Sequence, residues 1–132
     1  MVNGGECLEV NLNNFQFNDN EPIYLQIVEL IKRSIALGEL SQDDKLPSIR
    51  EMSSLLAVNP NTMQRAYSEL ERLGITYTKR GMGSFISEKN KNSSELKINM
   101  GIGIAKRFLK DMEDIGIVKK EALEIVESID DY

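Results

Sequence analysis

The chain has 132 residues, of which 41% are hydrophobic and 28% are charged, a composition typical of one soluble domain with a small appendage. It contains no histidine and a single cysteine, Cys7, which excludes an intrachain disulfide, a Cys/His zinc site and histidine-dependent catalysis. No stretch reaches about 18 uncharged apolar residues, and the N-terminus lacks the pattern of a signal peptide. We therefore expect a cytoplasmic protein that neither enters a membrane nor carries a metal or other cofactor.

The net charge of −5 argues against a nucleic-acid-binding protein when the chain is taken as a whole, but the charges are unevenly distributed. Residues 1–44 carry two basic and eight acidic side chains, and residues 92–132 carry six basic and nine acidic ones. Residues 45–91, in contrast, carry eight basic and four acidic side chains. A basic middle between acidic flanks can present one face to a polyanion while the rest keeps the protein soluble.

The first part of the chain predicts an extended segment followed by a helix. Apolar and polar residues alternate over 8–17, which indicates a short strand or an extended arm within the N-terminal segment, residues 1–19. The spacing then becomes helical and predicts a helix over 22–37, capped by Asn20 or Glu21. The apolar face of this helix consists of Ile23, Ile27, Leu30 and Ile31.

Two further helices separated by a tight turn are predicted next. Ser48 and Glu51 fit a capping box, in which each side chain accepts a hydrogen bond from a main-chain N–H group, at the start of a helix over 49–56. Asn59 directly precedes a proline, an arrangement that suits the N-cap and first turn of a second helix over 60–73. The apolar positions of this second helix, which we expect in the core, are Met63, Ala66, Tyr67, Leu70 and Leu73.

The remaining segments predict a hairpin, a linker and a helical tail. Residues 75–78 and 84–87 are rich in β-branched and aromatic side chains and flank a basic, glycine-rich loop, so they predict a β-hairpin with a basic tip. A polar segment over 88–97 is typical of a linker. Residues 98–132 return to helical spacing and predict two helices with a break at Gly116.

A helix, a helix pair and a hairpin in this order predict an α+β winged helix-turn-helix domain over 20–87. The second helix of the pair offers its N-terminal turn to the DNA major groove, where amide and hydroxyl side chains bind base edges. The chain places such side chains in that turn, namely Asn59, Asn61, Thr62 and Gln64. Arg65 extends this set toward the DNA backbone, and the charges of Arg50, Lys79 and Arg80 suit guanine or phosphate.

The same segment resembles the DNA-binding domain of the GntR family over residues 20–87. The matching motifs are Pro22-Ile23-Tyr24 with Gln26-Ile27, Leu46-Pro47-Ser48 with Arg50, Val58 with Thr62, Ala66 with Leu70 and Gly74, and Gly81, Gly83 and Phe85. The turn Asn59-Pro60-Asn61-Thr62, the Ala66-Tyr67 pair and the short tail resemble the YtrA-like branch of small dimeric repressors. The resemblance implies a sequence-specific transcription regulator that contacts DNA through Ser48, Arg50, Asn59, Asn61, Thr62, Gln64, Arg80 and Gly81.

Some of these residues also have a purely structural interpretation. Ser48 and Asn59 can act only as helix caps, and Gly81 can serve only the geometry of the turn. A capping role and a DNA contact are compatible, so the two interpretations stay side by side. The chain also departs from many family members, which carry Arg or Lys where Pro60 and Gln64 stand, and this predicts fewer ionic contacts from the second helix.

The tail carries more large apolar side chains than two short helices can bury between them: Phe108, Leu109, Met112, Ile115, Ile117, Leu123, Val126 and Ile129. We expect these residues to form the interface of a two-fold homodimer. Two winged heads then bind the half-sites of a palindromic operator in double-stranded DNA, and the bound protein is associated with the nucleoid. No convergent polar set indicates a small-molecule effector, so none is assigned.

Two other function classes compete with a DNA-binding repressor. A winged-helix protein-interaction module would use the acidic flanks as its working surface, but the basic hairpin argues against it. An enzyme is not expected, because no cluster of carboxylate, lysine or serine side chains stands out as a catalytic group.

Overall fold

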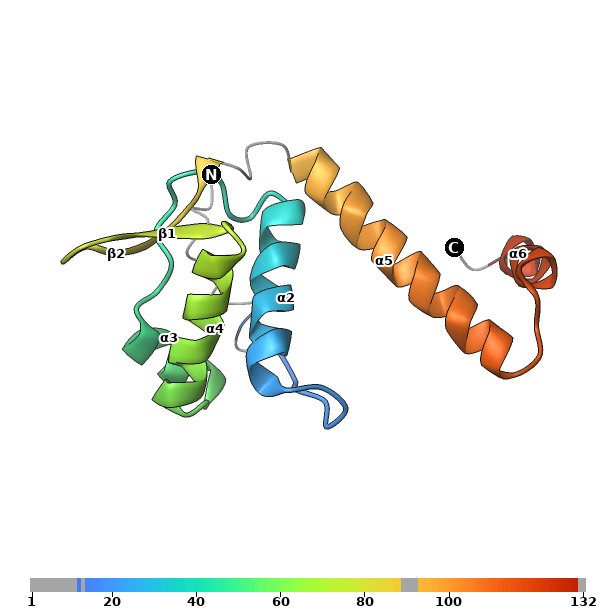
Figure 1. The fold of residues 1–132 in the computed structure, drawn as a ribbon, viewed down its shortest axis with the longest axis horizontal. Coiled ribbons are helices and arrows are strands. Elements are labelled where there is room, and N and C mark those ends of the chain that lie inside the picture. The colour runs from blue at the N-terminus through green and yellow to red at the C-terminus, as the bar shows by residue number, and fades with distance from the viewer. Residues whose placement is uncertain (1–11, 13, 89–92, 131–132) are drawn as a thin grey trace. The chain divides into compact units, whose positions relative to one another are not determined.

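The computed structural model describes residues 12, 14–88 and 93–130 (Figure 1). By its internal contacts the chain divides into two compact units, Met1–Lys97 and Ile98–Tyr132. The strand or arm predicted over 8–17 lies largely outside the described residues. Of this segment, residues 14–17 form a turn and irregular backbone and no strand, while Leu12 is buried in the core of the first unit.

Helix α2, Ile23–Ala36, has the predicted position but a different start. Pro22 is itself the N-cap and no side chain caps the helix, so the expectation that Asn20 or Glu21 caps it is wrong. The buried Gln26 side chain holds the incoming segment instead, because its amide group donates to the carbonyl oxygens of Glu21 at 2.8 Å and Asn18 at 2.9 Å. Gln26, a residue inside the helix, thus positions the main chain that leads into α2, a role expected of a capping residue.

Helices α3, Ile49–Leu56, and α4, Pro60–Arg72, form the predicted pair. The Ser48 hydroxyl accepts a hydrogen bond from the Glu51 N–H at 3.1 Å, which confirms this half of the capping box. The Asn59 side chain accepts from the Asn61 N–H at 2.8 Å and caps α4 as predicted. The left-handed backbone of Ala57, with φ of 53°, turns the chain between the helices.

Strands β1, Thr76–Lys79, and β2, Gly83–Ile86, form the predicted antiparallel hairpin, in which Thr76 pairs with Ile86 and Lys79 with Gly83. The sequence did not predict that residues 43–46 run along the other edge of β2. The Leu46 N–H donates to the Ser84 carbonyl at 2.9 Å, and an isolated bridge joins Lys45 to Phe85. The hairpin is therefore tied at its base to the segment that leads into α3.

The core of the first unit lies between α2, α3, α4 and the hairpin. Met63, Tyr67 and Leu70 of α4 are buried as predicted, but Leu73 is 42% exposed. Ile27, Leu30 and Ile31 of α2 are also buried as predicted, whereas Ile23 is 42% exposed at the start of the helix. These apolar contacts fix the exposed face of α4 relative to α3 and the hairpin.

The tail contains helices α5, Ser93–Asp114, and α6, Lys119–Ser128. Helix α5 begins before residue 98, so part of the segment predicted as a linker is helical, and Leu96 in its first turns packs against the core of the first unit. The predicted break at Gly116 is present, with φ of 85°. Within the described residues, no helix is both long and apolar enough to cross a membrane.

Candidate nucleic-acid interface

The N-terminal turn of α4 presents polar side chains to solvent. Asn59, Asn61 and Gln64 are exposed and Thr62 is half-buried, while the opposite face of the helix packs into the core. Pro60 occupies the first position of α4, where a main-chain N–H group has no partner within the helix. The lack of an N–H group in proline therefore costs no hydrogen bond there. The predicted amide and hydroxyl groups thus stand at the exposed end of a helix whose orientation the core determines.

Arg50 and Gln64 come from different helices and line the same open groove of about 630 Å³. Its walls are formed by α3 and by the turn into α4, with Ile49, Val58 and Pro60 contributing apolar surface. Ser53 also lines this groove, and its buried hydroxyl has no hydrogen-bond partner among the described residues. The groove combines a cationic side chain, an amide side chain and apolar surface, which are the groups that bind base edges and thymine methyl groups.

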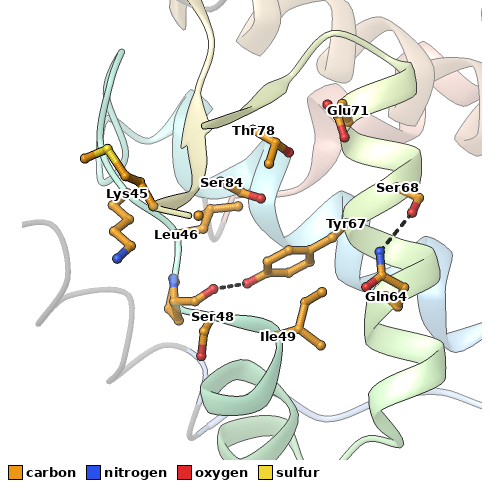
Figure 2. A pocket seen from close by; sticks show the side chains of 13 residues that line it. Lys45, Leu46, Ser48, Ile49, Gln64, Tyr67, Ser68, Glu71, Thr78 and Ser84 are labelled. Atoms are coloured by element: carbon orange, nitrogen blue, oxygen red, sulfur yellow. Dashed lines mark hydrogen bonds between the residues drawn. The ribbon is translucent and has the colours of Figure 1, made fainter. Parts of the chain in front are cut away.

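A second cavity, of about 330 Å³, separates α4 from the hairpin (Figure 2). The Gln64 side chain lines this cavity too and donates a hydrogen bond to the Ser68 hydroxyl at 3.3 Å. Ser48 lines the same cavity from the start of α3, so the structure brings Ser48 and Gln64 to one concave surface. This surface is bounded by α3, α4 and the hairpin together.

Several polar residues of this concave surface were missed in the sequence: Lys45, Ser68, Thr78 and Ser84. Ser68 could have been found, because it follows Gln64 by four residues and therefore shares its face of α4. Lys45 carried no comparable signal, since its place depends on the long-range pairing of residues 43–46 with β2.

The hairpin presents Lys79, Arg80 and Gly81 at its tip, all of them exposed. Lys79 lies near the aromatic rings of Tyr77 and Phe85, with its ammonium group 5.0 Å from the centroid of the Phe85 ring. Arg80 and Gly81 lie beyond the residues that line either cavity. The φ of 79° at Gly81 is one that residues with side chains rarely adopt, so the turn itself accounts for the glycine.

The hairpin is also fixed to the segment before α3 by side chains. Tyr77 stacks on Phe85, with 5.7 Å between the ring centroids, and its hydroxyl donates a hydrogen bond to the Asp43 carboxylate at 2.6 Å. The hydrogen bond to Asp43 raises the pKa of Tyr77 above its ordinary value, because ionisation would remove the donated proton. These contacts hold the basic tip in a defined position relative to α3.

Arg65 is placed differently from the rest of the predicted set. Its guanidinium group lies over the ring of Tyr24, a residue of α2, with 3.9 Å between the guanidinium carbon and the ring centroid. Arg65 lines neither cavity, so the structure does not bring it together with Arg50 or with the hairpin tip.

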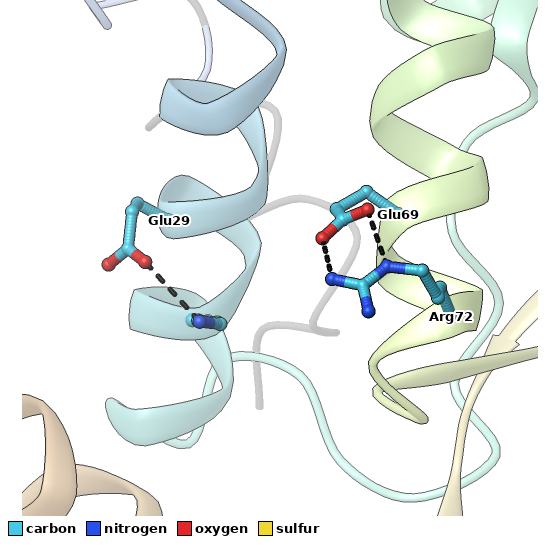
Figure 3. A network of polar contacts seen from close by, with 4 residues as sticks. Glu29, Glu69 and Arg72 are labelled. Atoms are coloured by element: carbon cyan, nitrogen blue, oxygen red, sulfur yellow. Dashed lines mark hydrogen bonds and ion pairs between the residues drawn. The ribbon is translucent and has the colours of Figure 1, made fainter. Parts of the chain in front are cut away.

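Glu69, which follows Arg65 by four residues on α4, forms an ion pair with Arg72. Glu69 accepts hydrogen bonds from Nε of Arg72 at 2.9 Å and from Nη2 of the same side chain (Figure 3). This pairing holds the pKa of Glu69 below its ordinary value. Neither residue was part of the sequence prediction.

The tail residues predicted at a dimer interface are only partly covered within one chain. Ile115 is 73% exposed, Leu123 49%, Val126 48% and Ile129 49%. The other predicted residues, Phe108, Leu109, Met112 and Ile117, are half-buried. Further exposed apolar residues that the prediction left out are Ile98, Ile102, Ile104, Val118 and Ile125.

Among the residues that the structure describes, no group of three or more His, Cys, Asp or Glu side chains could hold a metal ion. The polar residues that line the groove and the concave surface carry amide and hydroxyl groups, together with Arg50 and Lys45, and Glu71 is the one carboxylate among them. Apart from Glu71, these are groups that bind nucleic-acid bases and phosphates and are poor ligands for metals.

Comparisons with known proteins agree with this geometry. The family model for "Bacterial regulatory proteins, gntR family" matches residues 23–86. The uncharacterized HTH-type transcriptional regulator YhcF of Bacillus subtilis is 49% identical over 109 residues, which are 83% of this chain and 90% of the relative. The HTH-type transcriptional repressor YtrA of Bacillus subtilis is 38% identical over 109 residues, or 82% of this chain and 84% of the relative.

Solved structures show the same relationship. A GntR family transcriptional regulator from Listeria monocytogenes has a TM-score of 0.74 and 38% identity over 86% of this chain and 100% of its own. The DNA-binding domain of AraR in complex with operator ORX1 has a TM-score of 0.50 and 29% identity over 55% of this chain and 92% of its own. The chain therefore belongs to the gntR family of bacterial regulatory proteins, as a YtrA-like transcription regulator with a winged helix-turn-helix DNA-binding domain.

Proposed function

We propose that the protein is a dimeric repressor that binds a palindromic operator through α4 and the hairpin. The observation that carries this proposal is that Gln64 lines both hollows beside the exposed N-terminal turn of α4, the open groove together with Arg50 and the concave surface together with Ser48. Asn59, Asn61 and Thr62 lie in that turn and bind base edges or phosphates of the major groove. The AraR domain, which is similar in fold, was solved on operator DNA.

The hairpin tip contacts the DNA backbone in this proposal. Lys79 and Arg80 bind phosphates or enter the adjacent minor groove, and the left-handed turn at Gly81 lets the main chain approach the duplex. The excess of basic side chains over residues 45–91 supports this role, because phosphate contacts supply most of the sequence-independent affinity.

The tail forms the two-fold interface. Apolar side chains exposed on α5, α6 and the turn between them would remain in water in a monomer, which is an unfavourable arrangement for a patch of this kind. A second copy of the chain covers them and holds two winged heads on one body, so that both half-sites of a palindrome are bound together. Repression then follows from occlusion of the promoter by the bound dimer.

The proposal is tested by measuring affinity for a labelled random-sequence duplex over a range of salt concentrations. If each head neutralises several phosphates, log affinity falls with log salt by about 0.9 for each phosphate contacted, despite the net negative charge of the protein. An affinity that does not change with salt would contradict the proposal. It would direct attention to a protein-interaction role for the winged head.

A further inference from the structure

Arg65 is the one predicted DNA-contacting arginine that rests on an aromatic ring. On α4 it follows Asn61 by four residues, so the two side chains share the exposed face of the helix. Its guanidinium carbon lies 3.9 Å from the centroid of the Tyr24 ring. Tyr24 is half-buried and packs against the core, so its position is determined by the fold of the head. The exposed Arg65 side chain on α4 is thereby supported by the Tyr24 ring on α2.

Arg65 forms no ion pair with Glu69, the carboxylate one turn further along α4, although its charge helps to lower the pKa of that group. Both carboxylate oxygens of Glu69 accept hydrogen bonds from Arg72, as Figure 3 shows. Among the residues that the structure describes, Arg65 forms no ion pair. The N–H donors of Arg65 are therefore not taken up by a carboxylate and can bind a group outside the chain.

An aromatic ring holds an arginine in a way that a carboxylate cannot. The face of the ring attracts the cation without accepting its in-plane N–H groups, so the donors stay free to bind an oxyanion. A carboxylate partner would occupy those donors and cancel the charge. The ring also restricts a side chain that has many rotamers, which lowers the entropy lost when the guanidinium group binds a ligand.

We propose that Tyr24 is a positioning residue for DNA binding, whose ring holds the Arg65 guanidinium group where it meets a phosphate of the bound duplex. This inference rests on the proposed function, because it assigns a role within the same protein–DNA interface. The proposal also explains why Arg65 lies apart from the concave surface. Arg65 binds the DNA backbone beside the major groove, and the other predicted residues enter the major groove itself.

A double-mutant cycle on the full-length protein tests the proposal, with a labelled random-sequence duplex as the probe. The four proteins are the wild type, Tyr24→Leu, Arg65→Ala and the double variant, and Tyr24→Phe serves as the control that keeps the ring. We expect Tyr24→Leu to weaken binding about two- to fivefold for each head that contacts the duplex, the range typical of an exposed cation–π contact. Tyr24→Phe should bind as the wild type does.

Two readouts separate positioning from a general loss of structure. Arg65→Ala should lower the slope of log affinity against log salt by about 0.9 for each head, since one phosphate contact is lost. In that background, Tyr24→Leu should cause no further loss of affinity, even if it lowers the melting temperature. An equal loss in both backgrounds would overturn the inference, because the ring would then act through packing alone. A wild-type protein that binds no duplex at low salt would instead overturn the proposed function itself.

Discussion

The Tyr67 hydroxyl group donates a hydrogen bond to the main-chain carbonyl oxygen of Pro47, which lies 20 residues earlier in the chain. Tyr67 belongs to α4, and Pro47 directly precedes Ser48, the N-cap of α3. Only 7% of Tyr67 is exposed, so this hydrogen bond links the two helices at the edge of the core. It fixes the distance between the start of α3 and the exposed face of α4, the two parts that form the proposed DNA-binding surface.

Replacing Tyr67 with phenylalanine should lower the free energy of unfolding by about 1 kcal/mol, because the Pro47 carbonyl loses its partner while the ring keeps its packing. Urea denaturation followed by circular dichroism measures this difference. A variant as stable as the wild type would show that the hydrogen bond contributes nothing to the fold.

The same tyrosine predicts a loss of stability at high pH. Burial, and next the negative charge of Glu51, raise the pKa of Tyr67 above its ordinary value. Its contribution is therefore fully present below about pH 10, where an unfolded tyrosine is still protonated, and is lost as the pH rises further. The stability difference between wild type and Tyr67→Phe should shrink above that pH, whereas a constant difference would contradict the assignment. Tyr77 is present in both proteins, so its own raised pKa cancels in the comparison.

Asn59 allows capping to be separated from DNA binding. Its side chain caps α4 through the Asn61 N–H, so Asn59→Ala should cost about 1 kcal/mol of stability, whereas Asn59→Ser keeps a capping oxygen and should cost little. If Asn59 also contacts the operator, both variants should bind it more weakly. Thermal unfolding and operator affinity measured on the same preparations decide the matter, and unchanged affinity of Asn59→Ser would leave Asn59 as a cap only.

The starts of α3 and α4 and the hairpin could be predicted from the sequence because their signals are local. Ser48 caps through a residue three positions away, Asn59 caps through one two positions away, and each cap lies beside a proline. The pairing of Lys45 with the hairpin and the packing of Arg65 on Tyr24 could not be predicted, because each joins segments far apart in the chain. The early start of α5 was missed because polar residues suit an exposed helix as well as a linker.

Arg50 should contribute to operator binding without contributing much to stability. It is exposed at the start of α3 and lines the groove it shares with Gln64, so Arg50→Ala should weaken operator binding about tenfold or more. Arg33 is exposed in the last turn of α2 and offers a matched control with the same change of charge. Fluorescence anisotropy should show a clear difference between the two variants, and equal effects would mean that only net charge matters.

The tail predicts a dimer that a single charge can disrupt. Val126 is 48% exposed on the apolar face of α6, and Val126→Glu would bury a carboxylate in the proposed interface. The control, Ser128→Glu, adds the same charge at an exposed polar position of that helix. Sedimentation equilibrium should give a dimer for the wild type and the control and a monomer for Val126→Glu. A wild type that sediments as a monomer would refute the proposed interface.

The most direct test of the central claim is selection of bound sequences from a random duplex pool, with the mass of the complex determined in the same preparation. The proposed function predicts a palindromic sequence bound by two copies of the chain, with half-sites about one helical turn apart. Recovery of no preferred sequence at low salt by the folded protein would contradict it, as would a single half-site bound by one copy.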